Sequence, residues 1–278
     1  MLRRATELDD YKLGAIDGEI GKVIEFFFDD QSWTIRYLVA ETGGWLSLRQ
    51  VLISPYALGP AKEDARVIPV DLTREQIEKS PSFDSDRPVS RQYERDYYSY
   101  YGWPGYWVGP YAWGSSPYPI RGRREWSEAD RQAVDDCYGP SQAHGLDESS
   151  DSDRHATVED AHLRSTADVT GRDIQAQDGE IGHVGDFVID DETWAIRYLI
   201  VDTRNWWPGK KVLISTRWIE RISWAESKVF INLTRDAIKQ APEYTEKTLI
   251  TRDHEIKLHR HYDREGYWTG EPAAAHIR

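Results

Sequence analysis

The stretch that decides the fold is DGEIGKVIEFFFDDQSWTIRYLV at residues 17–39, which recurs as DGEIGHVGDFVIDDETWAIRYLI at residues 178–200. The two copies lie 161 residues apart (178 − 17 = 161) and align without a gap. In this register residues 14–81 and 175–242 share 26 identical positions out of 68, far more than chance gives. The match extends to Gly105-Tyr106-Trp107 and Gly266-Tyr267-Trp268. The chain is therefore a tandem duplication of one unit, residues 2–107 repeated at 163–268.

Each copy has the pattern of a small β-domain. The Asp-Gly pairs at 17–18 and 178–179 predict tight turns. Apolar and β-branched runs predict strands over 20–28, 33–40, 51–53 and 67–70, and over 181–189, 194–201, 212–214 and 229–231. Thr73 and Thr234 are expected to cap a short helix that ends at Pro81 or Pro242.

We therefore expect a mainly β protein made of two small antiparallel β-barrels in tandem. Each barrel should bury its own core and carry one short C-terminal helix and an aromatic tail. The expected divisions are a first barrel (1–81), its aromatic tail (82–113), an acidic disordered linker (114–162), a second barrel (163–242) and a second tail (243–278). A short helix is expected at 126–137 within the linker.

Charge and cysteine content restrict the class of protein. The 278 residues carry a net charge of −13, concentrated at 125–162, where eleven acids face two arginines (2 − 11 = −9). Tight phosphate binding needs clustered Lys and Arg, so nucleic acid is not the expected partner. The single cysteine, Cys137, forms no intrachain disulfide. With no signal peptide and no membrane span in the pattern, the expected location is the cytoplasm.

The order D-G-E-I-G-x-V, W-x-I-R-Y-L, V-L-I-S and L-T-R followed by Pro resembles the PRC-barrel family. That family includes the cytoplasmic domain of the photosynthetic reaction centre H subunit and the C-terminal domain of a ribosome maturation factor. The resemblance covers residues 14–81 and 175–242, and it implies compact barrels that bind other proteins without a shared enzymatic activity. The membrane helix of the H subunit and the N-terminal domain of the ribosome factor are not matched here.

No residue pattern predicts catalysis, a cofactor or a metal. The acids of the DGE and DD motifs are expected to shape turns. His254, His259 and His261 could suggest metal ligands, but the first copy has Tyr93, Tyr98 and Tyr100 at these positions, which excludes a shared metal site. Arg36 and Arg197 are expected to pair with the turn acids at the barrel surface.

The aromatic tails are the candidate interaction surface. Large rigid rings are typical interface anchors. Recurrence of the rings in the second copy favours packing on a barrel over exposure. Tyr111 and Trp113 lie beyond the repeat and are expected to be exposed. The predicted surface comprises Tyr101, Trp103, Tyr106, Trp107, Tyr111, Trp113, Tyr262, Tyr267 and Trp268.

The sequence thus predicts a non-enzymatic protein-binding or scaffold module. Its two barrels should form an intramolecular pair that imitates a homodimer, with further self-association left open. The alternatives are an RNA- or ribosome-associated factor, an accessory protein of photosynthetic electron-transfer complexes by family association, and an enzyme with its site between the barrels.

Overall fold

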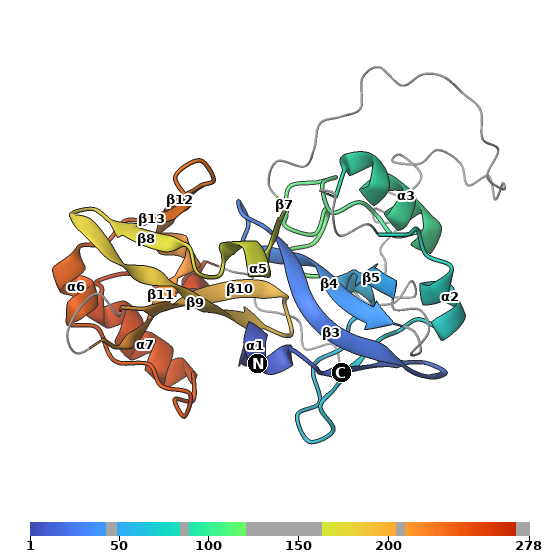
Figure 1. Ribbon diagram of the computed structural model, residues 1–278, viewed down its shortest axis with the longest axis horizontal. Helices are drawn as coiled ribbons and strands as arrows, with labels where there is room; N and C mark the ends of the chain where they lie inside the picture. Colours follow the sequence, from blue (N-terminus) through green and yellow to red (C-terminus); the bar gives the residue numbers. More distant parts are fainter. Residues whose placement is uncertain (43–48, 84–88, 121–162, 204–208, 271–278) are drawn as a thin grey trace, which may run out of the picture. The chain divides into compact units, whose positions relative to one another are not determined.

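A computed structural model of the protein describes residues 1–42, 49–83, 89–120, 163–203 and 209–270 (Figure 1). Most of the expected linker, including Cys137 and the helix expected at 126–137, lies outside the described residues. The chain divides into two compact units, which cut across the expected domain ranges. The first unit contains 1–9, 25–35 and 164–278, and the second contains 10–24 and 36–163.

The second unit is built from strands of the first repeat. Its hydrogen-bonded order is β6 (Val67–Pro69), β2 (Lys12–Ala15), β3 (Gly18–Asp29), β4 (Thr34–Thr42) and β5 (Arg49–Ile53). The end of β3, from residue 25, and the start of β4, up to residue 35, belong to the first unit. The interior is lined by side chains of these strands, with Leu13, Val39 and Ile53 fully buried.

The first unit repeats this order with strands of the second repeat. The sequence of neighbours is β12 (Ile219–Ser223), β13 (Lys228–Ile231), β8 (Asp173–Ala176), β9 (Gly179–Asp190), β10 (Ala195–Asp202) and β11 (Lys211–Ser215). The predicted mainly β fold is confirmed, and every predicted strand is present within a few residues of its expected bounds.

The expectation of purely antiparallel pairing is wrong. Strand β2 pairs with β6, and β8 with β13, in parallel. A parallel pair needs a long crossover rather than a hairpin. The chain between β2 and β6 provides one, because β3, β4 and β5 all intervene. The sheet is therefore mixed, and its closure into a barrel stays a prediction.

The short helices α2 (Arg74–Glu78) and α6 (Arg235–Lys239) are confirmed. Thr73 caps α2 in a capping box with Gln76, and Thr234 accepts a hydrogen bond from the Ala237 amide in α6. The Asp-Gly turns support them, because Asp17 Oδ1 accepts from the Arg74 amide and Asp178 Oδ1 from the Arg235 amide, both at 2.8 Å. The turn role predicted for these acids is thus confirmed.

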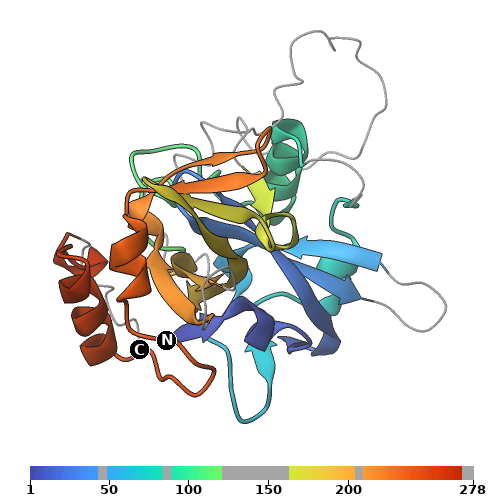
Figure 2. The same ribbon diagram turned by 60° about the vertical axis from the view of Figure 1, so that its left-hand side comes forward.

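Each aromatic tail contains a longer helix that was not predicted from the sequence. Helix α3 (Arg91–Tyr101) is capped by Ser90 and ends at Gly102 in the left-handed conformation, and α7 (Arg252–His261) is capped by Thr251. Figure 2 shows α6 and α7 side by side, and a ring nitrogen of His261 lies 2.8 Å from the Ala237 carbonyl oxygen. Tyrosine is a weak helix former, so packing rather than propensity sets the tyrosine-rich α3.

The first strands of the two repeats are exchanged. Strand β1 (Leu2–Arg4) pairs antiparallel with β9 of the second repeat, and β7 (Leu163–Ser165) pairs with β3 of the first. Helix α1 (Ala5–Leu8) follows β1 and also lies against β9 (Figure 1). The expectation that each repeat buries a core of its own is therefore wrong, because an element of each completes the sheet of the other. We call this arrangement the reciprocal exchange.

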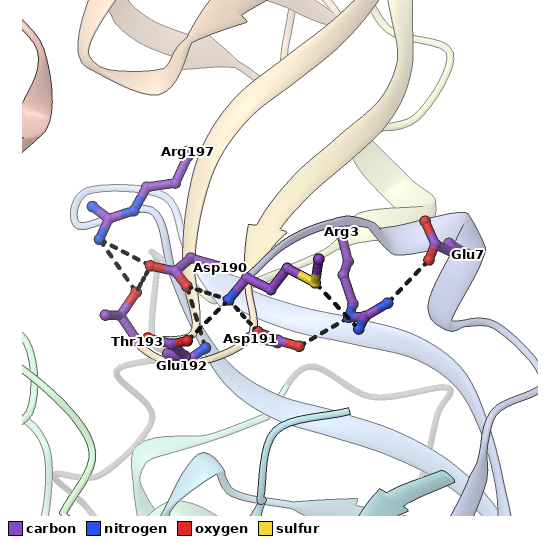
Figure 3. A network of polar contacts seen from close by, with 8 residues as sticks. Arg3, Glu7, Asp190, Asp191, Glu192, Thr193 and Arg197 are labelled. Atoms are coloured by element: carbon purple, nitrogen blue, oxygen red, sulfur yellow. Dashed lines mark hydrogen bonds and ion pairs between the residues drawn. The ribbon is translucent and has the colours of Figure 1, made fainter. Parts of the chain in front are cut away.

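Equivalent ion pairs hold both sides of the reciprocal exchange. Arg3 Nε donates to Asp191 Oδ2 at 2.9 Å, and Arg164 Nε donates to Asp30 Oδ2 at 3.0 Å. These pairs are equivalent in the repeat register (3 + 161 = 164; 30 + 161 = 191). Figure 3 shows Arg3 between Asp191 and Glu7, which its Nη1 reaches at 3.2 Å. The Met1 ammonium lies 2.5 Å from Asp191 Oδ1, and the pKa of that ammonium is raised by its contacts with Asp191, Asp190 and Glu192 against the opposing effect of burial.

The centre of the reciprocal exchange is a two-way backbone ladder. The Ile35 amide donates to the Trp194 carbonyl at 2.8 Å, and the Ile196 amide donates to the Trp33 carbonyl at 2.7 Å. Both tryptophans have positive φ, 51° and 56°, and both are buried. Equivalent positions of the two repeats thus hydrogen-bond to each other through their backbones.

Candidate functional site

The feature that most needs explanation is a buried carboxylate in each repeat, Glu94 on α3 and Glu255 on α7. Their residues are 0% and 2% exposed. An ionised carboxylate is costly to bury unless hydrogen bonds and charges compensate. The two acids occupy equivalent positions (94 + 161 = 255), so the same polar centre has been built twice.

The first centre joins β4, α3 and the tail of the first repeat. The Tyr37 and Tyr106 hydroxyls donate to Glu94 Oε1 at 2.8 and 2.9 Å. Arg91 Nη1 lies 2.9 Å from Glu94 Oε2. Glu94 on α3 therefore hydrogen-bonds both β4, through Tyr37, and the tail, through Tyr106.

The second centre has the same construction. The Tyr198 hydroxyl lies 2.8 Å from Glu255 Oε1, Tyr267 also hydrogen-bonds this carboxyl group, and Arg252 Nη1 lies 3.0 Å from Oε2. Burial raises the pKa of Glu255, while the hydroxyls and Arg252 act in the opposite direction. Burial also raises the pKa of Tyr198, so its phenol stays protonated.

Arginines stack on the tail rings in both repeats. The Arg36 guanidinium lies 3.8 Å from the centroid of the Tyr106 ring, and Arg197 lies 4.0 Å from that of Tyr267. Cation–π contacts of this kind are strengthened when desolvated. The ion pair expected with a turn acid is confirmed for Arg197, which lies 3.4 Å from Asp190. Arg36 donates to the Ala112 carbonyl. Both arginines are buried rather than at the surface.

The structure places the predicted interaction residues mainly inside the two units. Trp107 and Trp268 are half-buried, and Tyr111 is 52% exposed, as expected. Trp113 was expected to be exposed, but it is 1% exposed because it packs edge-on against Tyr56 at 5.1 Å. The other predicted residues are buried: Tyr101, Trp103, Tyr106, Tyr262 and Tyr267.

Sequence reasoning missed the two carboxylates as a site. Their recurrence with Arg91 and Arg252 was visible in the repeat register, but exposed Arg and Glu three residues apart on a helix would give the same pattern. What identifies the centre is the invariant set of partners, Tyr37 with Tyr106 and Tyr198 with Tyr267. These pairs are far apart in sequence and meet only through the fold.

The tail hydroxyl should contribute measurably to stability. We expect Tyr106→Phe to lower the free energy of unfolding by about 1–3 kcal/mol, because the buried Glu94 carboxylate loses a hydrogen bond that water cannot replace. Tyr111→Phe is the matched control and should change it by less than about 0.5 kcal/mol, since that ring is exposed. Urea titration followed by tryptophan fluorescence measures both. Equal effects would contradict the anchoring role.

Two further kinds of site concern the described residues, a metal centre and a membrane-spanning helix. Among them, no group of three or more His, Cys, Asp or Glu side chains is placed to hold a metal ion. None of the helices in the described part of the chain has both the length and the apolar character needed to cross a bilayer. In both centres the hydrogen bonds of the buried carboxyl group join a strand to a tail.

Comparison with known families concerns the second repeat. The PRC-barrel domain family model matches residues 163–238, which run from β7 into α6. No curated protein sequence matches the chain. A PRC-barrel domain is therefore present in the second repeat.

Proposed function

We propose that the protein is a non-enzymatic binding scaffold of the cytoplasm, built on two PRC-barrel repeats and recognising another protein. The first repeat is assigned to the same fold because it shares the strand order and 26 of 68 aligned residues with the second. Its net charge of −13 favours a protein partner over nucleic acid.

The observation that carries this proposal is the exposed Tyr111 ring on a rigid aromatic base. The turn is closed by hydrogen bonds between Tyr111 and Gly114 in both directions, at 3.0 and 3.2 Å. Beneath it, Trp113 is buried against Tyr56, and Arg36 holds the Ala112 carbonyl. An exposed aromatic ring on a preorganised support is typical of an interface anchor.

The test is photocrosslinking in cells that make the protein, with a benzophenone side chain at position 111. The matched control is position 249, where Leu249 is 79% exposed in the first unit. We expect a defined crosslinked protein from position 111 only, and Tyr111→Ser should abolish its co-purification without changing the melting temperature. The same crosslinks from both positions, or co-purification unaffected by Tyr111→Ser, would refute the proposal.

The same experiment addresses the RNA-associated alternative. Several basic side chains are paired with acids, such as Lys228 with Glu180 at 2.5 Å and Arg221 with Glu226 at 3.4 Å. Crosslinking to RNA, with binding that weakens steeply as salt rises, would replace the protein-scaffold proposal by that alternative.

A further inference from the structure

The second centre differs from the first by one residue that changes its proton content. His259 occupies the position of Tyr98 (98 + 161 = 259) and is 2% exposed. Its Nε2 lies 3.1 Å from the Tyr198 hydroxyl, and its Nδ1 lies 2.9 Å from the Glu265 carbonyl oxygen. Together with Glu255 Oε1, 2.8 Å from the same hydroxyl, these atoms form a buried chain of hydrogen bonds.

The hydrogens in this chain can be counted. A carbonyl oxygen only accepts, so His259 Nδ1 must carry a hydrogen. A neutral imidazole then has a bare Nε2. The Tyr198 hydroxyl has one hydrogen and two neighbours, Glu255 Oε1 and His259 Nε2, that would both be acceptors. Both contacts become hydrogen bonds only if one more proton is present, on the carboxyl group or on Nε2.

We propose that the second repeat contains a buried proton-binding site, in which Glu255 and His259 share one proton through the Tyr198 hydroxyl. In the preferred form the proton is on Glu255 Oε1. The carboxyl group donates to Tyr198, and Tyr198 donates to His259 Nε2. Oε2 then remains for Arg252, which approaches that oxygen and not Oε1. An unpaired buried acceptor would be costly, and this arrangement leaves none in the chain.

The charged groups around the site act differently on its two ends: the arginines oppose a neutral carboxyl group on Glu255 and favour a neutral imidazole on His259. Arg252 from α7 and Arg197 from β10 act on Glu255, and Arg217 from η3 (Thr216–Trp218) acts with Arg252 on His259. Tyr267 from the tail hydrogen-bonds Glu255. Burial, the largest cause, raises the pKa of Glu255 and lowers the pKa of His259, and the arginines further lower that of His259. Burial therefore acts at both ends towards a neutral carboxyl beside a neutral imidazole, and the hydrogen count of the chain places the shared proton on Glu255.

The first repeat provides a natural comparison without such a site. Its Tyr98 carries a hydroxyl hydrogen of its own, and this hydroxyl lies 3.3 Å from Ser54 Oγ. Tyr37 and Tyr106 each bring a hydrogen to Glu94. No bare ring nitrogen faces this centre, so the contact of Tyr37 with Glu94 needs no additional proton.

The site links stability to pH in a definite direction. In the unfolded chain, Glu loses its proton at about pH 4.3 and His at about pH 6.5. Between these values both states hold one proton, on Glu255 when folded and on His259 when unfolded, so the site contributes no slope. Above about pH 6.5 only the folded state holds the proton, because folding raises the pKa of the site. The free energy of unfolding therefore falls as the pH rises through the folded-state pKa. Below about 4.3 the unfolded chain takes up a second proton, and stability falls again.

The experiment compares the full chain with two variants. His259→Tyr copies the first repeat and removes the need for the proton. On unfolding in guanidinium at a pH of about 7.5, we expect the natural protein to release about one proton more than His259→Tyr, measured by pH-stat titration. Equal release would overturn the proposal.

Glu255→Gln gives a second readout that does not require His259→Tyr to fold. The amide donates permanently to Tyr198, as the protonated carboxyl would. The melting temperature should therefore stop falling between about pH 6.5 and 9, where that of the natural protein falls. Infrared absorption of a protonated carboxyl at pH 7 should be lost in this variant. An unchanged pH slope, or a 15N spectrum with the proton of neutral His259 on Nε2, would overturn the site.

Discussion

Replacing Asp191 by Ala is expected to lower the free energy of unfolding by about 3–5 kcal/mol. Asp191 is 2% exposed and accepts from Arg3, whose side chain is 6% exposed. Removing the acid leaves a buried guanidinium with its main counter-ion gone, and the nearby Met1 ammonium loses its shortest contact as well. Breaking a buried pair from one side is costly because the remaining charge stays desolvated. Urea unfolding at neutral pH measures the loss.

The matched control for this change is Asp30→Ala, which removes the equivalent acid on the other side of the reciprocal exchange. The Arg164 and Asp30 side chains are 21% and 12% exposed, so water can solvate the orphaned arginine. Arg164 also keeps its stacking on Trp224 at 4.4 Å. We expect a loss of only about 1 kcal/mol. Equal losses in the two variants would contradict the role given to burial.

Gly182→Ala is expected to destabilise the protein by at least about 4 kcal/mol, which marks an exceptional site. Gly182 has φ of +142°, and a Cβ placed there would lie 2.0 Å from the Asp202 carbonyl oxygen. That atom belongs to the backbone of β10, so no side-chain rotation relieves the overlap. The register of β8 on β9 also shifts beside this position, between Ile174 and Gln175.

Gly171→Ala separates the two causes of that loss. Gly171 also has positive φ, +84°, but nothing lies within 4 Å of a Cβ built there. Its replacement should cost about 1–2 kcal/mol for the backbone conformation alone. Thermal unfolding of both variants under the same conditions gives the comparison. If Gly182→Ala were no worse than Gly171→Ala, close backbone approach would not explain the invariant second Gly of the two DGEIG motifs.

The strands could be predicted from the sequence because their apolar periodicity is local and appears twice. Ile20 and Ile181 and the W-x-I-R-Y-L stretches carry the signal in one register. The partners of those strands could not be predicted, since β1 and β7 are only three residues long and show no period. Their pairing follows from Arg3 meeting Asp191 and Arg164 meeting Asp30, which only the fold brings together.

The tail helices and the two buried carboxylate centres could not be predicted from the sequence for a different reason. In α3 the buried positions Glu94, Tyr97, Tyr98 and Tyr101 do form one helical stripe, but a charged residue within a run of tyrosines does not indicate a buried face. The difference between Tyr98 and His259 was visible as a broken match. Its chemical meaning needed the distances to Tyr198 and Glu265.

The domain that sequence similarity delimits does not contain all the strands that complete its own sheet. The stretch 163–238 is recognisable by itself, yet one edge of its β9 is completed by Leu2–Arg4. It would also lose the Trp33 carbonyl that receives the Ile196 amide. Cloning limits drawn at the edges of the recognised stretch would discard the strand that completes β9 and the carbonyl that receives the Ile196 amide.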